Sequence, residues 1–277
     1  MSSSVPRTAL ADGTSIDVVG YGVYKVPPAD TARLCSTALE AGYRLLDTAA
    51  LYGNEGGVGA AARAYLEAGD RSDLSVTSKV WNDDHGYDAT LRAFDASMDR
   101  LGLDQLDFYL IHWPCASRDL YVETWRALVR LRDEGRVRSI GVSNFQQLHL
   151  ERLLTETGVA PVLNQVELHP YLQQHELRSF HEEHGIATQA WSPLGRGNVL
   201  LDPDIGRIAA DLGRTPAQVV LRWHLQHGIL TIPKASSPER IASNLDVFGF
   251  TLDDAQLGVL DTLDRDQRFG SHPDRVG

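Results

Sequence analysis

Short apolar runs alternate with longer amphipathic stretches along almost the whole chain. Most of the runs are continuous, which is typical of strands that are buried on both faces of a sheet. The stretches between them carry apolar residues at helical spacing, as in Leu91, Phe94, Met98 and Leu101. Alternation of strands and helices predicts a parallel sheet. The predicted strands cover residues 16–20, 44–47, 74–79, 106–112, 137–143, 162–167, 187–191 and 229–233.

With residues 16–20 as the first strand, the chain contains eight strand–helix units. Eight units suit a closed (β/α)8 TIM barrel, and a doubly wound sheet is the rival arrangement. Residues 8–17 surround an Asp-Gly pair and predict a β-hairpin that covers one end of the barrel. Residues 204–212 and 251–264 predict two extra helices, the second of them followed by a loose tail. We therefore expect an α/β TIM barrel with an N-terminal hairpin and two extra helices.

The composition narrows the class of protein. No Pro/Ser/Gly-rich linker divides the 277 residues, and α/β barrels run to roughly 250 residues as one domain, so we expect a single domain over 1–277. The net charge of -11 argues against nucleic acid and anionic membranes as partners. A few local cations can still hold a phosphorylated cofactor on such a surface.

The location of the protein is predicted from what the chain lacks. Cys35 lies in a helical pattern and Cys115 follows a strand end, so two such thiols indicate a reducing compartment rather than a disulfide framework. Residues 1–7 contain no apolar signal core, and no apolar stretch approaches the ~18 residues of a membrane span. We expect a soluble, cytoplasmic protein, and a monomer because no exposed apolar helix face is evident.

Polar residues collect at or just beyond the carboxyl ends of the predicted strands. In parallel α/β barrels this face carries the active site. A single charge at a strand end is more often part of a structural ion pair, but several on successive strands indicate a shared site. These residues are Asp47, Lys79, His112, Ser143, Asn144, Glu167 and Lys234.

Asp47, Tyr52, Lys79 and His112 together suit acid catalysis beside a hydride donor. A carbonyl that receives a hydride needs a proton, and a free tyrosine with a pKa of ~10 is a poor donor at pH 7. A nearby lysine ammonium would lower the pKa of the tyrosine, and a carboxylate would keep a buried lysine charged. A histidine can hold the carbonyl oxygen and help to relay the proton.

Five segments that contain these residues resemble the signatures of the aldo-keto reductase family. The resemblance extends from about residue 8 to residue 275, in the expected order. The segment Trp81-Asn82 and the short C-terminus are most similar to the bacterial branch that includes 2,5-diketo-D-gluconic acid reductases. The five segments are 47–55 (DTAALYGNE), 77–81 (TSKVW), 110–114 (LIHWP), 141–145 (GVSNF) and 232–234 (IPK).

The resemblance implies an NADPH-dependent oxidoreductase that reduces small aldehydes and ketones to alcohols, with keto sugar acids and methylglyoxal-like dicarbonyls among the candidates. It makes Tyr52 the general acid, with Lys79 tuning its pKa and Asp47 holding Lys79. It makes His112 the residue that orients the substrate oxygen. The positions that resemble walls of the substrate pocket are Tyr24, Trp81, His112 and Trp113.

The resemblance also implies a set of residues that bind NADPH/NADP+. Trp191 resembles the aromatic residue that stacks on the nicotinamide, and Lys234 with Arg240 resembles the clamp on the adenosine 2′-phosphate. The chain has Ala235 where the family usually has a serine, so Ser236 or Ser237 would have to replace that hydroxyl, and we expect a smaller margin of NADPH over NADH. The full set is Gly22, Ser143, Asn144, Gln165, Trp191, Ser192, Leu194, Gly195, Lys234, Ser236, Arg240 and Asn244.

Some motifs favour other interpretations and are weaker. Residues 57–62 fit the glycine-rich dinucleotide pattern but do not directly follow a predicted strand, so we expect close packing at a helix start instead. His181 and His184 are spaced by three rather than four, and the other histidines form no ligand cluster, so we expect no metal site.

Two other functions remain open at this point. The first is a barrel that binds the cofactor as a regulatory subunit, with little turnover. The second is a hydrolase or aldolase without nicotinamide. An aldolase would use Lys79 as a Schiff-base residue, but Asp47 would keep that amine protonated and non-nucleophilic.

Overall fold

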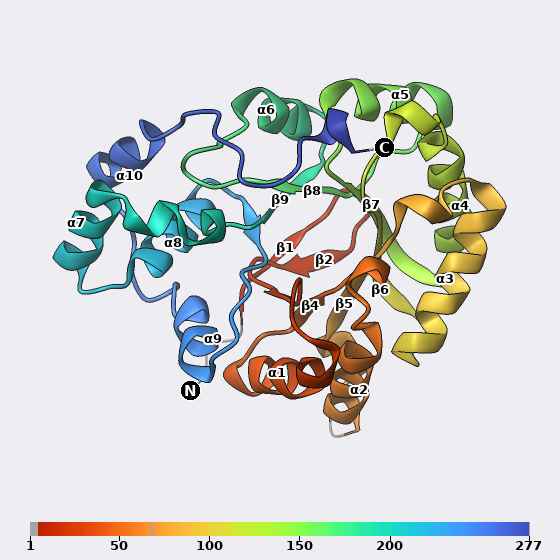
Figure 1. The fold of residues 1–277 in the computed structure, drawn as a ribbon, viewed down its shortest axis with the longest axis horizontal. Helices are drawn as coiled ribbons and strands as arrows, with labels where there is room; N and C mark the ends of the chain where they lie inside the picture. The colour runs from red at the N-terminus through yellow and green to blue at the C-terminus, as the bar shows by residue number, and fades with distance from the viewer. Residues whose placement is uncertain (1–4, 68, 277) are drawn as a thin grey trace.

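The chain forms a closed barrel of parallel strands inside an outer ring of helices. The computed structural model describes residues 5–67 and 69–276. Figure 1 shows the helices arranged around the strands. The barrel strands are β3 (Tyr21–Gly22), β4 (Leu45–Asp47), β5 (Ser75–Val80), β6 (Leu106–Ile111), β7 (Val137–Ser143), β8 (Leu163–Glu167), β9 (Ala187–Trp191) and β10 (Leu230–Thr231).

Each strand is followed by a helix that packs on the outside of the sheet. The helices of the eight units are α1 (Pro28–Ala41), α2 (Glu55–Leu66), α3 (Tyr87–Leu101), α4 (Tyr121–Asp133), α5 (Gln147–Thr157), α6 (His175–Glu183), α8 (Pro216–Gln226) and α9 (Pro238–Leu245). The two predicted extra helices are present as α7 (Pro203–Leu212) and α10 (Asp254–Asp261), which contact each other beside α8 (Figure 1).

The strands follow one another around the barrel in chain order, from β3 to β10, and all neighbours are parallel. The sheet closes between β10 and the segment that leads into β3. There the amide of Gly20 donates to the carbonyl of Thr231 (2.8 Å), and the amide of Thr231 donates to the carbonyl of Val18 (3.0 Å). Sequential order and closure confirm the barrel and exclude the doubly wound sheet.

The hairpin is confirmed, and its strands are β1 (Arg7–Ala9) and β2 (Ser15–Asp17). The prediction that residues 16–20 form the first barrel strand was right only for its second half: Val19 pairs in parallel with Thr231, whereas Ile16 and Asp17 belong to β2. The side chain of Ile16 belongs to the hairpin and is fully buried in the barrel interior against residues such as Leu45 and Phe108. Barrel pairing begins at residue 18 and continues into β3, and the side chain of Ile16 fills the barrel interior instead of joining the barrel sheet.

Residues 57–62 pack closely against neighbouring helices, as predicted. They lie in the first turns of α2, where Gly59 faces the carboxyl end of α3. A Cβ atom on Gly59 would lie 1.9 Å from the carbonyl oxygen of Leu101. The glycines therefore allow helix contact and do not cradle a phosphate.

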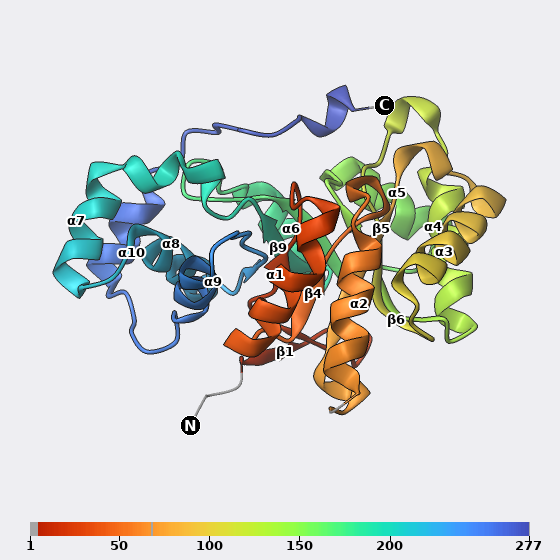
Figure 2. The same cartoon turned by 60° about the horizontal axis from the view of Figure 1, so that its bottom comes forward.

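The tail after α10 is not loose, contrary to the sequence prediction. Residues 265–276, here called the C-terminal strap, cross the carboxyl end of the barrel, opposite the hairpin (Figures 1 and 2). The amide of Gln267 donates to the carbonyl of Tyr171 (2.9 Å), and the amide of Phe269 donates to Glu167 Oε1 (2.6 Å). A tail without strong apolar periodicity gives no sign of such backbone contacts in the sequence.

Cys35 and Cys115 are both buried and unpaired, in line with the expected absence of a disulfide framework. Among the described residues, no helix combines the length and the apolar character that crossing a bilayer requires.

Candidate active site

The carboxyl ends of the strands bring a buried ion pair to the barrel mouth. Asp47 ends β4 and Lys79 lies near the end of β5, and the Lys79 Nζ–Asp47 Oδ1 distance is 2.7 Å. Lys79 also donates to the carbonyl of Thr48 (2.8 Å), and Gln165 Nε2 donates to Asp47 Oδ2 (2.8 Å). Both charges are thus removed from water and satisfied by further hydrogen bonds, as a buried ion pair requires.

Tyr52 lies against this ion pair. It ends a short 3-10 helix, Ala50–Tyr52, and Lys79 Nζ is 5.3 Å from the centre of its ring. The ring of His112 is 5.6 Å from that of Tyr52, and the ring of Tyr24 is 5.1 Å from it. Four residues predicted as one catalytic group are therefore adjacent in space, with Tyr24 beside them.

The pKa of Tyr52 shifts upward, whereas the sequence analysis expected Lys79 to lower it. Burial of the phenol is the largest cause, and the neighbours Asp47 and Tyr24 add to it. The expectation counted the charge of Lys79 without that of Asp47, and the two form a pair with little net charge. The phenol is therefore kept protonated at neutral pH.

His112 is held in its neutral form. Burial lowers its pKa well below 6.5, and the charges of Lys79 and His85 act in the same direction. Its Nδ1 atom is buried and has no hydrogen-bond partner among the described residues. The ring of Trp81 packs edge-on against the ring of His112, with 5.2 Å between the ring centres. Trp113, the next residue in the chain, is also buried.

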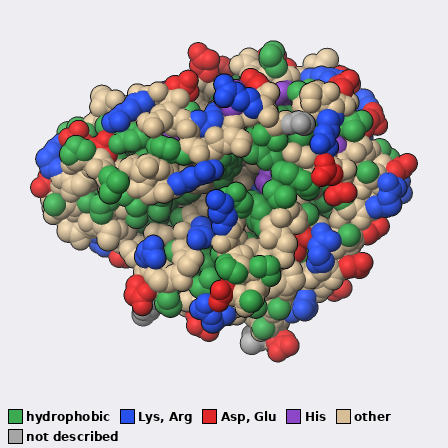
Figure 3. Space-filling model, viewed as in Figure 1, with side chains coloured by type: hydrophobic (Ala, Val, Ile, Leu, Met, Phe, Trp, Pro, Cys, Tyr) green, Lys and Arg blue, Asp and Glu red, His purple; other side chains and the backbone are tan. Residues whose placement is uncertain are grey.

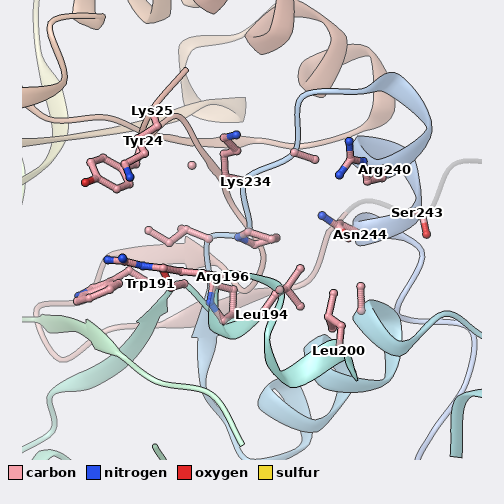
Figure 4. A pocket seen from close by; sticks show the side chains of 18 of the residues that line it. Tyr24, Lys25, Trp191, Leu194, Arg196, Leu200, Lys234, Arg240, Ser243 and Asn244 are labelled. Atoms are coloured by element: carbon pink, nitrogen blue, oxygen red, sulfur yellow. The ribbon is translucent and has the colours of Figure 1, made fainter. Parts of the chain in front are cut away.

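A cavity of about 650 Å³ lies across the barrel mouth, bounded by β3, the loops after β9 and β10, and α9. Asp47 and Tyr24 line it, whereas Tyr52, Lys79 and His112 are not among its lining residues. Four of its lining residues are cations: Lys25, Arg196, Lys234 and Arg240 (Figure 4). Asp47 is the one carboxylate among the lining residues described, and Lys79 already pairs with it. Figure 3 shows Lys and Arg side chains gathered around the hollow at the centre of this face. On a chain of net charge -11, such a lining suits a polyanionic ligand.

The residues predicted to bind the cofactor fall into three groups in the structure. Seven line the cavity: Gly22, Trp191, Ser192, Leu194, Lys234, Arg240 and Asn244. Three form a hydrogen-bonded layer beside it, in which Trp191 Nε1 donates to Asn144 Oδ1 (2.8 Å), Ser143 Oγ donates to the carbonyl of Gln165 (2.8 Å), and Gln165 holds Asp47.

The remaining two, Gly195 and Ser236, are not among the residues that line the cavity. A Cβ atom on Gly195 would lie 2.7 Å from Val199 Cγ1, so this glycine serves close packing. Ser236 Oγ accepts a hydrogen bond from Lys234 Nζ (3.1 Å). Ser237, the other candidate, caps α9 and accepts from Arg240 Nε (3.3 Å). Both serines thus hold the cations rather than face the cavity.

Sequence reasoning missed several lining residues. Lys25 follows the predicted pocket residue Tyr24, and its φ of 59° places it in the left-handed region of the backbone. The segment 215–217 was recognised only as a helix start, and Thr215 does cap α8, but these residues also border the cavity. A helix cap is visible in a sequence, whereas the approach of that helix end to a distant strand is not.

No group of three potential metal ligands occurs among the residues described, outside the gaps at 1–4, 68 and 277. His181 is buried, and its ring nitrogens form hydrogen bonds with Asn164 (3.0 Å) and Thr188 (2.8 Å). These contacts give His181 a structural role.

Comparisons with known proteins identify the family of the chain. The sequence profile of the Aldo/keto reductase family matches residues 18–265. An aldo-keto reductase of Mycolicibacterium smegmatis is 53% identical, with 97% of each chain covered. The glyoxal reductase of Bacillus subtilis is 46% identical, with 100% of this chain and 99% of the relative covered. The methylglyoxal reductase DkgA of Escherichia coli K12 is 45% identical, with 97% of each chain covered.

A solved structure is also closely similar. The crystal structure of a Gox0644 mutant in complex with NADPH superposes with a TM-score of 0.94 at 50% identity, over 99% of this chain and 100% of that one. The family profile spans most of the chain, and the relatives are similar over nearly their full lengths. The protein therefore belongs to the aldo/keto reductase family.

Proposed function

We propose that this protein reduces small aldehydes and ketones with NADPH, and that reactive dicarbonyls such as glyoxal and methylglyoxal are among its substrates. The observation that carries the proposal is the contact of Tyr52 with the buried Asp47–Lys79 pair at the end of a cation-lined cavity. Two relatives named for glyoxal and methylglyoxal reduction support the substrate class.

The chemistry of the cavity fits NADPH. Arg240 lies on α9, and Lys234 lies between it and Lys25 (Figure 4), so a 2′-phosphate at this side of the cavity would be held by charge-assisted hydrogen bonds. Lys25 and Arg196 lie nearer to Trp191 and would face the pyrophosphate. The indole of Trp191 offers a flat surface for the nicotinamide. Bound NADPH would supply the hydride to the carbonyl carbon.

The chain's own residues supply the proton and the charge stabilisation. Tyr52 is protonated at neutral pH, and the forming alkoxide, a stronger base than a phenolate, would take this proton as hydride reaches the carbon. The phenolate that remains lies beside the ammonium of Lys79, which stabilises it at that moment. Neutral His112 would orient the carbonyl oxygen without competing as an acid.

The test is the loss of NADPH absorbance with glyoxal, methylglyoxal, a nitrobenzaldehyde and a diketo sugar acid, each repeated with NADH. We expect turnover of the dicarbonyls and a higher kcat/KM with NADPH. Absence of turnover on every carbonyl would contradict the proposed reaction, and equal efficiency with NADH would contradict the cofactor preference.

Two charge-removing variants refine the assignment of the cofactor. Lys234→Met and Arg240→Met should each raise KM for NADPH about tenfold, the loss of one charge-assisted hydrogen bond to phosphate, with little change in KM for NADH. Arg207→Met is the matched control, because Arg207 is exposed on α7 and pairs with Asp204 outside the cavity.

A further inference from the structure

A buried carboxylate holds the C-terminal strap on the barrel. Glu167 ends β8 and its side chain is fully buried. It accepts hydrogen bonds from the amides of Phe269 (2.6 Å) and Gly270 (2.9 Å), and from His169 Nε2 (3.2 Å). Arg268 Nη1 lies 3.8 Å from it. Burial works to raise the pKa of Glu167, but these hydrogen bonds outweigh it and lower the pKa, so the carboxylate is ionised at neutral pH.

Gly270 lies directly against the indole of Trp191. A Cβ atom at this position would be 2.3 Å from Trp191 Cη2 and 2.8 Å from Glu167 Oε2. Gly270 does not adopt the left-handed backbone conformation, so its backbone does not demand glycine. The requirement is steric: only a residue without a side chain allows the strap to contact both the indole and the carboxylate.

The indole is therefore fixed at two places. Its Nε1 atom donates to Asn144 Oδ1 (2.8 Å), and the far edge of its six-membered ring meets Gly270. Phe269 packs on the ring of His169 at 5.1 Å, which holds the strap from the other side. Trp191 itself faces the cavity (Figure 4).

We propose that Glu167 and Gly270 are positioning residues, which act through the C-terminal strap to set the plane of the Trp191 indole, the surface on which nicotinamide would pack. This inference rests on the proposed function. It adds two residues that touch neither the substrate nor the reacting atoms, and it gives the strap a role in cofactor geometry.

The direct test follows the indole of Trp191 in the cofactor-free protein. All tryptophans are replaced by 5-fluorotryptophan, and Trp191→Phe identifies the fluorine resonance of Trp191. We expect Gly270→Ala and Glu167→Gln to shift or broaden this resonance and to leave the other four in place. Gly258→Ala, at an open position of α10, is the matched glycine control and should change none of them.

The second readout is the split between KM and kcat. We expect Gly270→Ala to raise KM for NADPH about tenfold, because a displacement near 1 Å in a binding surface has effects of that order or greater. The double variant should be no worse than Gly270→Ala alone, since both changes act through one strap. Should Gly270→Ala fail to fold, Glu167→Gln adds no bulk and carries both measurements.

An unchanged Trp191 resonance would overturn the inference, and so would an unchanged KM for NADPH accompanied only by a lower melting temperature. Wild-type protein without NADPH-dependent turnover would instead refute the proposed function. The resonance would still show whether Glu167 and Gly270 hold the indole, so the two failures are distinguishable.

Discussion

Tyr52 lies beside a pair of opposite charges rather than a single charge, and burial is what mainly keeps its phenol protonated. Lys79 Nζ and Asp47 Oδ1 lie 2.7 Å apart. Their opposite charges largely cancel in the electrostatic field that they produce at the phenol oxygen. Burial, with smaller contributions from Asp47 and Tyr24, raises the pKa of Tyr52, so the acid form is the resting form. The ammonium of Lys79 becomes important only when the phenol has given up its proton.

The first prediction concerns the phenol itself. Tyr52→Phe removes one oxygen and keeps the ring that packs against Tyr24 and His112. We expect kcat for methylglyoxal to fall by about 10²- to 10⁴-fold, the usual contribution of a positioned general acid. Quenching of tryptophan fluorescence by NADPH should persist. Turnover within a few-fold of wild type would exclude Tyr52 as the proton donor.

The second prediction concerns pH. Because the pKa of Tyr52 lies above 10, the proton for reduction is present throughout the neutral and moderately alkaline range. We expect kcat/KM for reduction to show no loss attributable to Tyr52 below about pH 10. The reverse oxidation of the alcohol needs the phenolate and should rise with pH. A reduction profile that falls near pH 8 in wild type, but not in Tyr52→Phe, would contradict this assignment.

Helix packing in the first half of the barrel depends on one glycine. The third prediction is that Gly59→Ala lowers the free energy of unfolding by about 1–3 kcal/mol, because the new Cβ would meet the carbonyl of Leu101 and force α2 and α3 apart. Gly206→Ala is the matched control, because it lies in α7 with open space around it and should stabilise by up to about 1 kcal/mol. Urea denaturation measures both, and equal effects would refute the packing role.

Long buried strands were predictable from the sequence, and short ones were not. The apolar runs that became β6, β7 and β9 lie within one residue of their predicted ends, since continuous apolar character marks a strand covered on both faces. β3 has two residues, Tyr21 and Gly22, and its pairing is set by neighbours far along the chain. A pattern of side chains cannot show where such a short strand begins.

The active site could be predicted in part. Tyr52 and the strand-end residues were predicted as site residues because they lie within sequence motifs, in which reactive side chains occur at fixed spacings. The contacts of Glu167 with Phe269 and Gly270 were not, because backbone amides donate identically in every sequence. The closeness of Gly270 to Trp191 is equally invisible before the strap has been placed.

The whole molecule buries several histidines in their neutral form, and this predicts sensitivity to acid. Burial lowers the pKa of His85, His181 and His224 from 6.5 to about 4. Between these values the unfolded chain binds more protons than the folded one, so stability falls as pH decreases from 6.5 to 4. Asp17, whose pKa burial raises to about 6, contributes with the opposite sign, but it is one group against three.

The fourth prediction follows from this balance. The free energy of unfolding, measured with urea, should be lower at pH 5 than at pH 7.5. His181→Gln should reduce that difference, because it removes one of the buried titrating groups. His175→Gln is the control: this exposed residue of the same helix lies 3.5 Å from Asp264, and its removal should change the difference less than His181→Gln does. A difference that is identical in all three proteins would rule out His181 as a contributor.

The seam that closes the barrel joins its first strand, β3, to its last, β10. Residues 18–22 pair with residues 231–233, and Tyr21 donates from its hydroxyl to the carbonyl of Ala235 (2.7 Å). A nascent chain that lacked β10 would leave the edges at β3 and β9 unpaired, and such edges are templates for pairing with other chains. The interval before β10 emerges is thus the time at which synthesis leaves this protein most open to aggregation, and release of the last strand ends it.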